Sequence, residues 1–183
     1  MSFKEKLQKS QSLGVITPSC AHILMGFYES FATAVEGNYK KEDVDTLFTT
    51  YLRLVEKQLQ EPYTFLPYHA MVTEAFDYYS FGLEFIRPLI DMQGSTLTGV
   101  DNLAKVASQL ASKDNVIFLA NHQIEADPQA ISVLLEKDFP SIGKQMIFVA
   151  GERVITDPLA VPFSMGRNLL CIFSKRYIDH PLS

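Results

Sequence analysis

The stretch that decides the fold is residues 116–128, VIFLANHQIEADP. It opens with Val116–Ala120, a short apolar run of the kind found in buried strands, and Ala130–Leu135 beyond it has the spacing of a helix. Two further strand-type runs occur at Met146–Ala150 and Leu169–Phe173. Strands that alternate with helical segments predict an α/β unit whose sheet is at least partly parallel.

The residues before Asp91 have helical periodicity instead. The apolar spacing and the helix start and stop signals predict amphipathic helices over Phe3–Leu13, from Thr17-Pro18 to Gly37, from Lys40 to just before Pro62, and from about Tyr68 to Pro88. After a small, polar connection at Gly94–Gly99, a further helix is expected at Leu103–Leu110. The fold class is therefore predicted as α/β in two parts: an amino-terminal helical bundle at 1–91, then an α/β domain with a mixed, partly parallel sheet at 92–183, apparently truncated.

Composition narrows the possible partners and the compartment. The chain has 183 residues with 16 Lys and Arg against 21 Asp and Glu, a net charge of −5 without a long basic run, so nucleic acid is not expected as a partner. No stretch reads as a membrane span or a signal peptide. The chain has two cysteines, which predict free thiols in a reducing, cytoplasm-like compartment.

The densest cluster of reactive side chains follows the first strand-type run. His122 and Asp127 are five positions apart, which in a strand would separate them by about 16 Å and in a helix would place them roughly 140° apart. A strand-to-helix turn could bring them together, and Pro128 supports one because proline favours the first helical position. A carboxylate bonded to one ring nitrogen would leave the other free to accept a proton, so His122 is a candidate general base.

Other interpretations of this cluster stay open. Asp127 alone could simply cap a helix, with His122 as a polar residue at a strand end. A metal site built from His122, Glu125 and Asp127 is a weaker alternative, because the spacing matches no recognised zinc signature. Cys171 has apolar neighbours and is expected to be a buried thiol rather than a nucleophile. The remaining histidines are expected to be structural or exposed: His22, His69 and His180.

Basic side chains occur at the predicted strand boundaries. Arg153 and Arg167 each stand close to a glycine there, and Lys175-Arg176 follow the third strand-type run. A guanidinium at such a boundary can bind an anionic group, so these four residues are candidates for a phosphate-bearing substrate. Each could instead be a solvated surface charge.

Three ordered blocks resemble a known family. They are NHQIEADP at 121–128, FVAGERVITDPL at 148–159 and PFSMGRNLLC at 162–171, and the likeness extends back through Gly99–Leu103. Together they resemble the soluble glycerol-3-phosphate 1-O-acyltransferases of the plastid type, also found in some intracellular bacteria. The resemblance covers nearly the whole chain and implies that residues 92–183 form an acyltransferase domain.

The resemblance implies a reaction and its participants. An acyl group would pass from an acyl-carrier-protein or coenzyme A thioester to the 1-hydroxyl of glycerol 3-phosphate, the first step of phospholipid synthesis. His122 would be the base and Asp127 its partner, with Arg153, Arg167, Lys175 and Arg176 binding substrate, and with no metal, cofactor or acyl-enzyme. A cytoplasmic or plastid-stromal location is expected, with contact to a membrane surface during product release and no transmembrane segment.

Two departures from the family pattern matter. Lys175-Arg176 match a basic pair that is followed in the family by histidine, but here Tyr177 follows. The sequence given ends at Ser183, and nothing in it matches the family's glycine-rich segment with arginines. The alternatives are a lysophosphatidate acyltransferase, which uses the same His/Asp pair, and a non-catalytic binding module that lacks half of the site.

Overall fold

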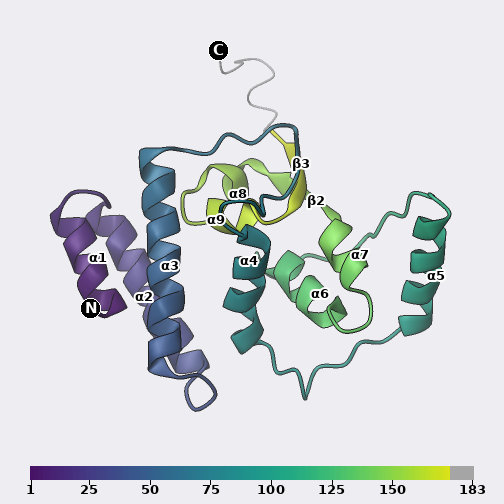
Figure 1. The fold of residues 1–183 in the computed structure, drawn as a ribbon, viewed down its shortest axis with the longest axis horizontal. Coiled ribbons are helices and arrows are strands. Elements are labelled where there is room, and N and C mark those ends of the chain that lie inside the picture. Colours follow the sequence, from purple (N-terminus) through teal and green to yellow (C-terminus); the bar gives the residue numbers. More distant parts are fainter. Residues whose placement is uncertain (174–183) are drawn as a thin grey trace.

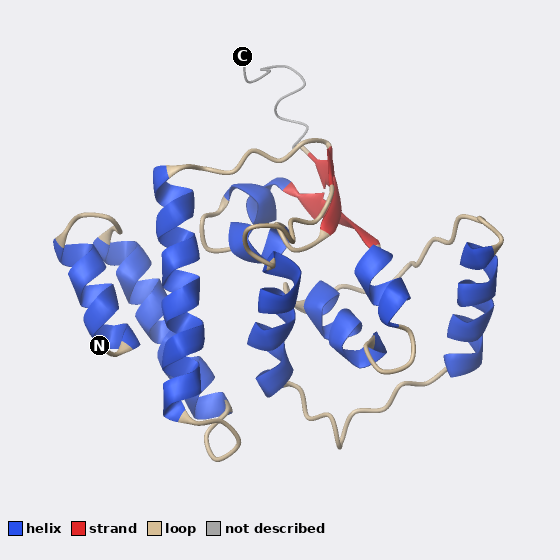
Figure 2. Cartoon of the chain, in the orientation of Figure 1, coloured by secondary structure: helices blue, strands red, loops and turns tan. Residues whose placement is uncertain are grey.

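The computed structural model describes residues 1–173 (Figures 1 and 2). Its elements, in chain order, are α1 (Phe3–Ser12), α2 (Pro18–Ala34), α3 (Lys41–Gln60), β1 (Tyr68–His69), α4 (Tyr78–Ile86), the 3₁₀ turn η1 (Arg87–Leu89), α5 (Val100–Ala111), α6 (Asp127–Leu135), α7 (Pro140–Gln145), β2 (Ile147–Gly151), α8 (Glu152–Thr156), α9 (Val161–Ser164) and β3 (Asn168–Ile172).

The first three predicted helices are confirmed as α1, α2 and α3, which pack against one another, with α2 antiparallel to both α1 and α3 (Figure 1). The predicted start of α2 at Thr17-Pro18 is confirmed. Ser2 and Glu5 form a reciprocal capping box at α1, and the Thr17 side chain accepts the Cys20 N–H at α2, with Pro18 in the first turn.

An aromatic cluster joins these helices to the rest of the molecule. Phe85 of α4 is fully buried, and five ring centroids lie 5.1–5.5 Å from its own: Phe27, Phe31, Phe48, Tyr51 and Phe163. These rings come from α2, α3 and α9, so the packing of α4 depends on segments far apart in the sequence. α4 therefore lies at the centre of the aromatic core.

The predicted boundaries of that helix are wrong. Tyr68 and His69 form β1, and the helix begins only at Tyr78, where the Asp77 carboxylate accepts the Ser80 N–H at 2.9 Å. The backbone before it is engaged elsewhere, because β1 pairs with β3. Ala75 also has a φ of 62°, which no α-helix accommodates. Pairing with a strand about a hundred residues later therefore overrides the apolar spacing.

The sheet has three strands in the order β1-β3-β2. β2 and β3 are parallel, with Ile147 opposite Asn168 and Gly151 opposite Ile172, whereas β1 is antiparallel to β3. The predicted strands at Met146–Ala150 and Leu169–Phe173 are thus confirmed to within one residue, and the sheet is mixed as expected.

The strand predicted at Val116–Ala120 is not formed. The segment pairs with no strand of residues 1–173, and Ile117 and Leu119 are 83% and 95% exposed. A fully apolar run becomes a strand only where neighbours pair its backbone and cover both of its faces. The described part of the chain supplies neither at this position, so the run lies on the surface outside any helix or strand.

The helix expected at Leu103–Leu110 is confirmed as α5, although none of its residues is buried and two long connections separate it from α4 and α6 (Figure 1). α4 packs against α6 and α9, which follow residue 91 in the sequence. The division of the chain at 91 therefore stays a prediction. No helix within residues 1–173 is long and apolar enough to cross a membrane.

Candidate active site

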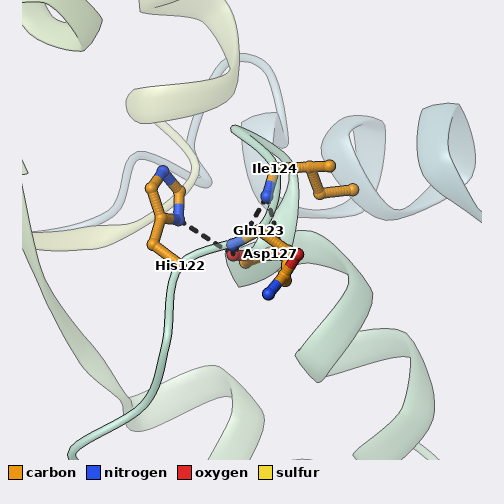
Figure 3. A network of polar contacts seen from close by, with 4 residues as sticks. All are labelled: His122, Gln123, Ile124 and Asp127. Atoms are coloured by element: carbon orange, nitrogen blue, oxygen red, sulfur yellow. Dashed lines mark hydrogen bonds and ion pairs between the residues drawn. The ribbon is translucent and has the colours of Figure 1, made fainter.

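The imidazole and carboxylate singled out in the sequence are in contact. His122 Nδ1 lies 2.8 Å from Asp127 Oδ2, across the bend that leads into α6 (Figure 3). The His122 side chain is 72% exposed, whereas that of Asp127 is 25% exposed. The carboxylate is thus the fixed and more sheltered member of the pair, and the imidazole reaches from it toward solvent.

Asp127 holds the bend together through the backbone. Its carboxylate accepts the Gln123 N–H at 2.8 Å and the Ile124 N–H at 3.3 Å, while its own N–H donates to the Ile124 carbonyl at 3.0 Å (Figure 3). α6 begins at Asp127, one residue earlier than expected, so Pro128 occupies the second helical position, where an N–H is not needed. The N-cap of α6 is Ala126, without a side-chain cap hydrogen bond, and the Asp127 carboxylate binds N–H groups that precede the helix. The structure therefore supports the pairing interpretation of Asp127 and not the capping interpretation.

These bonds keep the carboxylate charged. The hydrogen bond from the Gln123 N–H is the largest cause that lowers the Asp127 pKa below its ordinary value, and the Ile124 N–H and the His122 imidazole lower it further against an opposing effect of burial. An ionised carboxylate only accepts hydrogen bonds, so His122 Nδ1 must carry the proton in this contact. His122 Nε2 is then the basic nitrogen, available to a substrate proton.

A second polar contact places this bend beside the sheet. Arg153 Nη1 lies 3.8 Å from Glu125 Oε1, with side chains 82% and 63% exposed. Arg153 belongs to α8, which follows Gly151 at the carboxyl end of β2. The carboxyl ends of parallel strands are the usual position of ligand sites in open α/β sheets. The described residues thus bring Arg153 close to the His122–Asp127 bend.

The other predicted substrate-binding residues are not gathered there. Arg167 is only 3% exposed, and its Nη1 donates to Ser132 Oγ of α6 at 2.6 Å. Lys175 and Arg176 lie outside the described residues. Sequence reasoning also missed the contacts of Arg167 with Ser132 and Tyr79, because no local pattern links residues so far apart in the chain.

The structure also bears on the metal site, on Cys171 as a nucleophile and on the remaining histidines. Within residues 1–173, no group of three His, Cys, Asp or Glu side chains is arranged to hold a metal ion. Cys171 is buried on β3, and burial raises the pKa of its thiol, which opposes its use as a nucleophile. His69 is buried and structural, with Nδ1 3.3 Å from the Tyr63 hydroxyl and Nε2 3.3 Å from the Met165 carbonyl, while His22 is exposed. His180 lies outside the described residues.

Residues 95–181 match the model of the acyltransferase family. More particularly, the chain is similar to chloroplastic glycerol-3-phosphate acyltransferases. It is 38% identical to that of Spinacia oleracea over 180 residues, 96% of this chain and 38% of the relative. It is 40% identical over 176 residues to the enzyme ATS11 of Cucurbita moschata, 94% of this chain and 39% of the relative. For Arabidopsis thaliana the identity is 38% over 176 residues, 94% and 38% of the two chains.

The resemblance inferred from the three sequence blocks is thereby confirmed. The chain spans 38–39% of the length of these relatives, so the similarity concerns a part of each of them.

Proposed function

We propose that this chain carries the catalytic pair of a glycerol-3-phosphate 1-O-acyltransferase. The observation that carries the proposal is the 2.8 Å contact between His122 Nδ1 and Asp127 Oδ2, with the carboxylate fixed by two backbone N–H groups. The similarity to relatives named glycerol-3-phosphate acyltransferase supports this enzyme over a lysophosphatidate acyltransferase.

In the proposed reaction, His122 acts as general base. Its Nε2 accepts the proton of the 1-hydroxyl of glycerol 3-phosphate while the hydroxyl oxygen attacks the carbonyl carbon of an acyl-carrier-protein or coenzyme A thioester. The tetrahedral intermediate collapses, the carbon–sulfur bond breaks, and the imidazolium returns its proton to the leaving thiolate. Asp127 stabilises the imidazolium throughout. In these steps the acyl group passes directly from the thioester to the hydroxyl oxygen. The proposed mechanism therefore involves neither a covalent acyl-enzyme nor a cofactor.

Arg153 is proposed to bind the phosphate of the acceptor. Its guanidinium is within 3.8 Å of Glu125 in a loose and exposed contact, which is worth little in solvent. A phosphate offers a doubly charged, bidentate partner for the same guanidinium and would compete effectively with that carboxylate. Lys175 and Arg176 are proposed to complete this phosphate site. The sequence also suggests Arg167 as a substrate-binding residue. Its buried position and its hydrogen bond to Ser132 of α6 favour a structural role in positioning that helix instead.

The organisation around the site is part of the proposal. Residues 1–91 would form a helical bundle and residues 92–183 the acyltransferase portion, with α4 packed on α6 and α9 joining the two. The choice of acyl donor, the cytoplasmic or stromal location and the contact with a membrane surface during product release remain proposals that follow from the family resemblance.

The test is a transfer assay on this chain. Radiolabelled glycerol 3-phosphate is incubated with acyl-carrier-protein and coenzyme A thioesters, and lysophosphatidate is tested as a competing acceptor. His122→Ala is expected to lower turnover by about a hundredfold, whereas His22→Ala, which changes an exposed histidine of α2, leaves it unchanged. Labelled product that forms equally with His122→Ala, or no product above the His122→Ala background, overturns the proposal.

A further inference from the structure

Arg167 presents a buried positive charge with an unusual set of partners. It stands between α9 and β3, its residue is 3% exposed, and its guanidinium carbon lies 5.0 Å from the ring centroid of Tyr79 and 5.9 Å from that of Phe148. No carboxylate of residues 1–173 forms an ion pair with it. Burial lowers the Arg167 pKa to about 10, so the group still carries its charge at neutral pH.

Such an arrangement is costly for stability alone. A buried cation without a carboxylate partner loses its hydration without full compensation, and a hydrophobic side chain of similar size often serves the fold as well or better. In the described part of the chain, Nη2 of Arg167 has no hydrogen-bond partner, and neither has the buried Oε1 of Gln129 on α6. The buried guanidinium is therefore not expected to stabilise the core, and we look for its role in the contacts that it makes.

Within residues 1–173, the guanidinium forms its hydrogen bond with α6, the helix that begins at Asp127. Arg167 Nη1 donates to Ser132 Oγ at 2.6 Å, and the same oxygen lies 3.1 Å from the carbonyls of Pro128 and Gly143. A serine hydroxyl has one proton and two lone pairs, so it accepts from Arg167 while it donates to one of these carbonyls. Ser132 thus ties the start of β3 to α6 and α7 at a single buried point.

Two glycines allow the close approach that this point requires. A Cβ at Gly143 would lie 3.2 Å from Ser132 Cα, so a side chain there would force α7 and Ser132 apart by a few tenths of an ångström. A Cβ at Gly166 would collide with the backbone of Tyr78 and Tyr79, which places the chain before Arg167 directly against the start of α4. Arg167 is held in a fixed position by this packing, and it can transmit that position to α6.

We propose that Arg167 is a positioning residue: its guanidinium fixes α6 against the start of β3 and so holds the His122–Asp127 pair in place beside the carboxyl end of β2. Ser132 lies five residues after Asp127, about 8 Å along the helix, so the anchor acts on the helix that begins with the carboxylate partner of His122. The catalytic significance of this role rests on the proposed function, but the anchoring itself does not.

The experiment compares five variants of the whole chain by solvent-exchange NMR of the Gln123 and Ile124 amides, which donate to Asp127. Arg167→Met and Ser132→Ala are each expected to accelerate this exchange about tenfold, and their double variant no further, because both remove the same bond. Lys144→Met is the matched control, since the exposed Lys144 lies over the same Tyr79 ring at 5.9 Å, but within residues 1–173 its ammonium does not bind Ser132. It is expected to leave both amides unchanged.

Urea unfolding of the same variants separates positioning from stability. Arg167→Met is expected to keep the unfolding midpoint close to that of the parent chain, and Arg167→Lys to restore slow exchange to within about threefold, because lysine keeps one charged donor. Unchanged exchange in Arg167→Met, or additive effects in the double variant, overturns the proposal. If Arg167→Met fails to fold, the other two variants test the proposal. Faster exchange in Ser132→Ala with slow exchange in Arg167→Lys supports it, and unchanged exchange in Ser132→Ala overturns it.

Activity gives a separate readout. In the transfer assay, Arg167→Met is expected to lower kcat by about a hundredfold with little change in the KM for glycerol 3-phosphate, because a small displacement of a catalytic group affects the transition state most. A rise in KM with kcat unchanged would identify Arg167 as a substrate-binding residue instead. A parent chain without activity would refute the proposed function and leave the exchange result standing.

Discussion

Replacing Asp127 with asparagine separates the two functions of the carboxylate, orientation and charge. Its Oδ2 accepts from His122 Nδ1 and from the Gln123 N–H, both at 2.8 Å. An asparagine can place its carbonyl oxygen there and keep both bonds. The flipped amide would turn its NH₂ group toward the Gln123 N–H, donor against donor, so the Gln123 backbone favours the orientation that preserves the His122 tautomer.

The expected loss is therefore mostly that of the negative charge. Two unit charges about 4 Å apart attract by about 1 kcal/mol in water and about 4 kcal/mol at the effective dielectric of a protein surface. The His122 side chain is 72% exposed, which favours the lower half of that range. A loss of about 1–2 kcal/mol in the transition state corresponds to a turnover about fivefold to thirtyfold lower. Asp127→Ala also removes the orienting bonds and is expected to cost about a hundredfold or more.

The assay is the transfer of acyl groups to radiolabelled glycerol 3-phosphate, with Asp138→Asn as a control that makes the same chemical change at an exposed position. The expected order of turnover is the parent chain and the control first, then Asp127→Asn, then Asp127→Ala. If Asp127→Asn were as inactive as Asp127→Ala, or if neither change lowered turnover, the assignment of Asp127 as a charged, orienting partner would be refuted.

Two further predictions concern pH and stability. The pKa of Asp127 is lowered in the folded chain, so its charged carboxylate stabilises the bend at pH values above the ordinary carboxyl pKa of 3.8. This stabilisation is lost as the pH falls through the lower folded-state pKa. A ¹³C titration of the Asp127 carboxyl carbon should give a midpoint below 3.8, and a midpoint at or above 3.8 would contradict the hydrogen bonds described. Phe85→Ala should lower the free energy of unfolding by about 3–5 kcal/mol in urea, because it opens a cavity among five aromatic rings. Phe118→Ala, at a half-exposed site, should cost about 0.5 kcal/mol or less, and equal losses would refute this description of the core.

The candidate pair was predictable because its geometry is local. His122 and Asp127 are separated by five positions, and the residues needed to bend the chain between them, including Pro128, are adjacent in the sequence. The carboxylate finds its backbone donors at Gln123 and Ile124 within the same turn. Short-range hydrogen bonding of this kind is encoded by residue type and spacing, so it requires little from the rest of the molecule.

The failed strand and helix predictions involve long-range partners. Val116–Ala120 has the composition of a strand but finds no strand partner within residues 1–173, whereas Tyr68 and His69 lie in a helix-like pattern and pair with Leu170 and Leu169. Strand formation depends on neighbours that local composition does not specify. Local sequence also failed to predict the burial of a side chain. The glycine next to Arg167 suggests an exposed position at a strand boundary, but packing against Tyr79 and Ser132 buries the guanidinium.

The amino-acid sequence by itself determines the helices α1–α3 and the His122–Asp127 bend, because these depend on periodicity, caps and turns within a few residues of one another. The family resemblance likewise follows from three ordered blocks of sequence. Only the tertiary structure decides that Tyr68 joins the sheet, that Arg153 lies near Glu125 and that Arg167 is buried against α6. Those contacts join residues from about 30 to about 100 positions apart, and the free energy of such long-range contacts is realised only when the whole chain is packed.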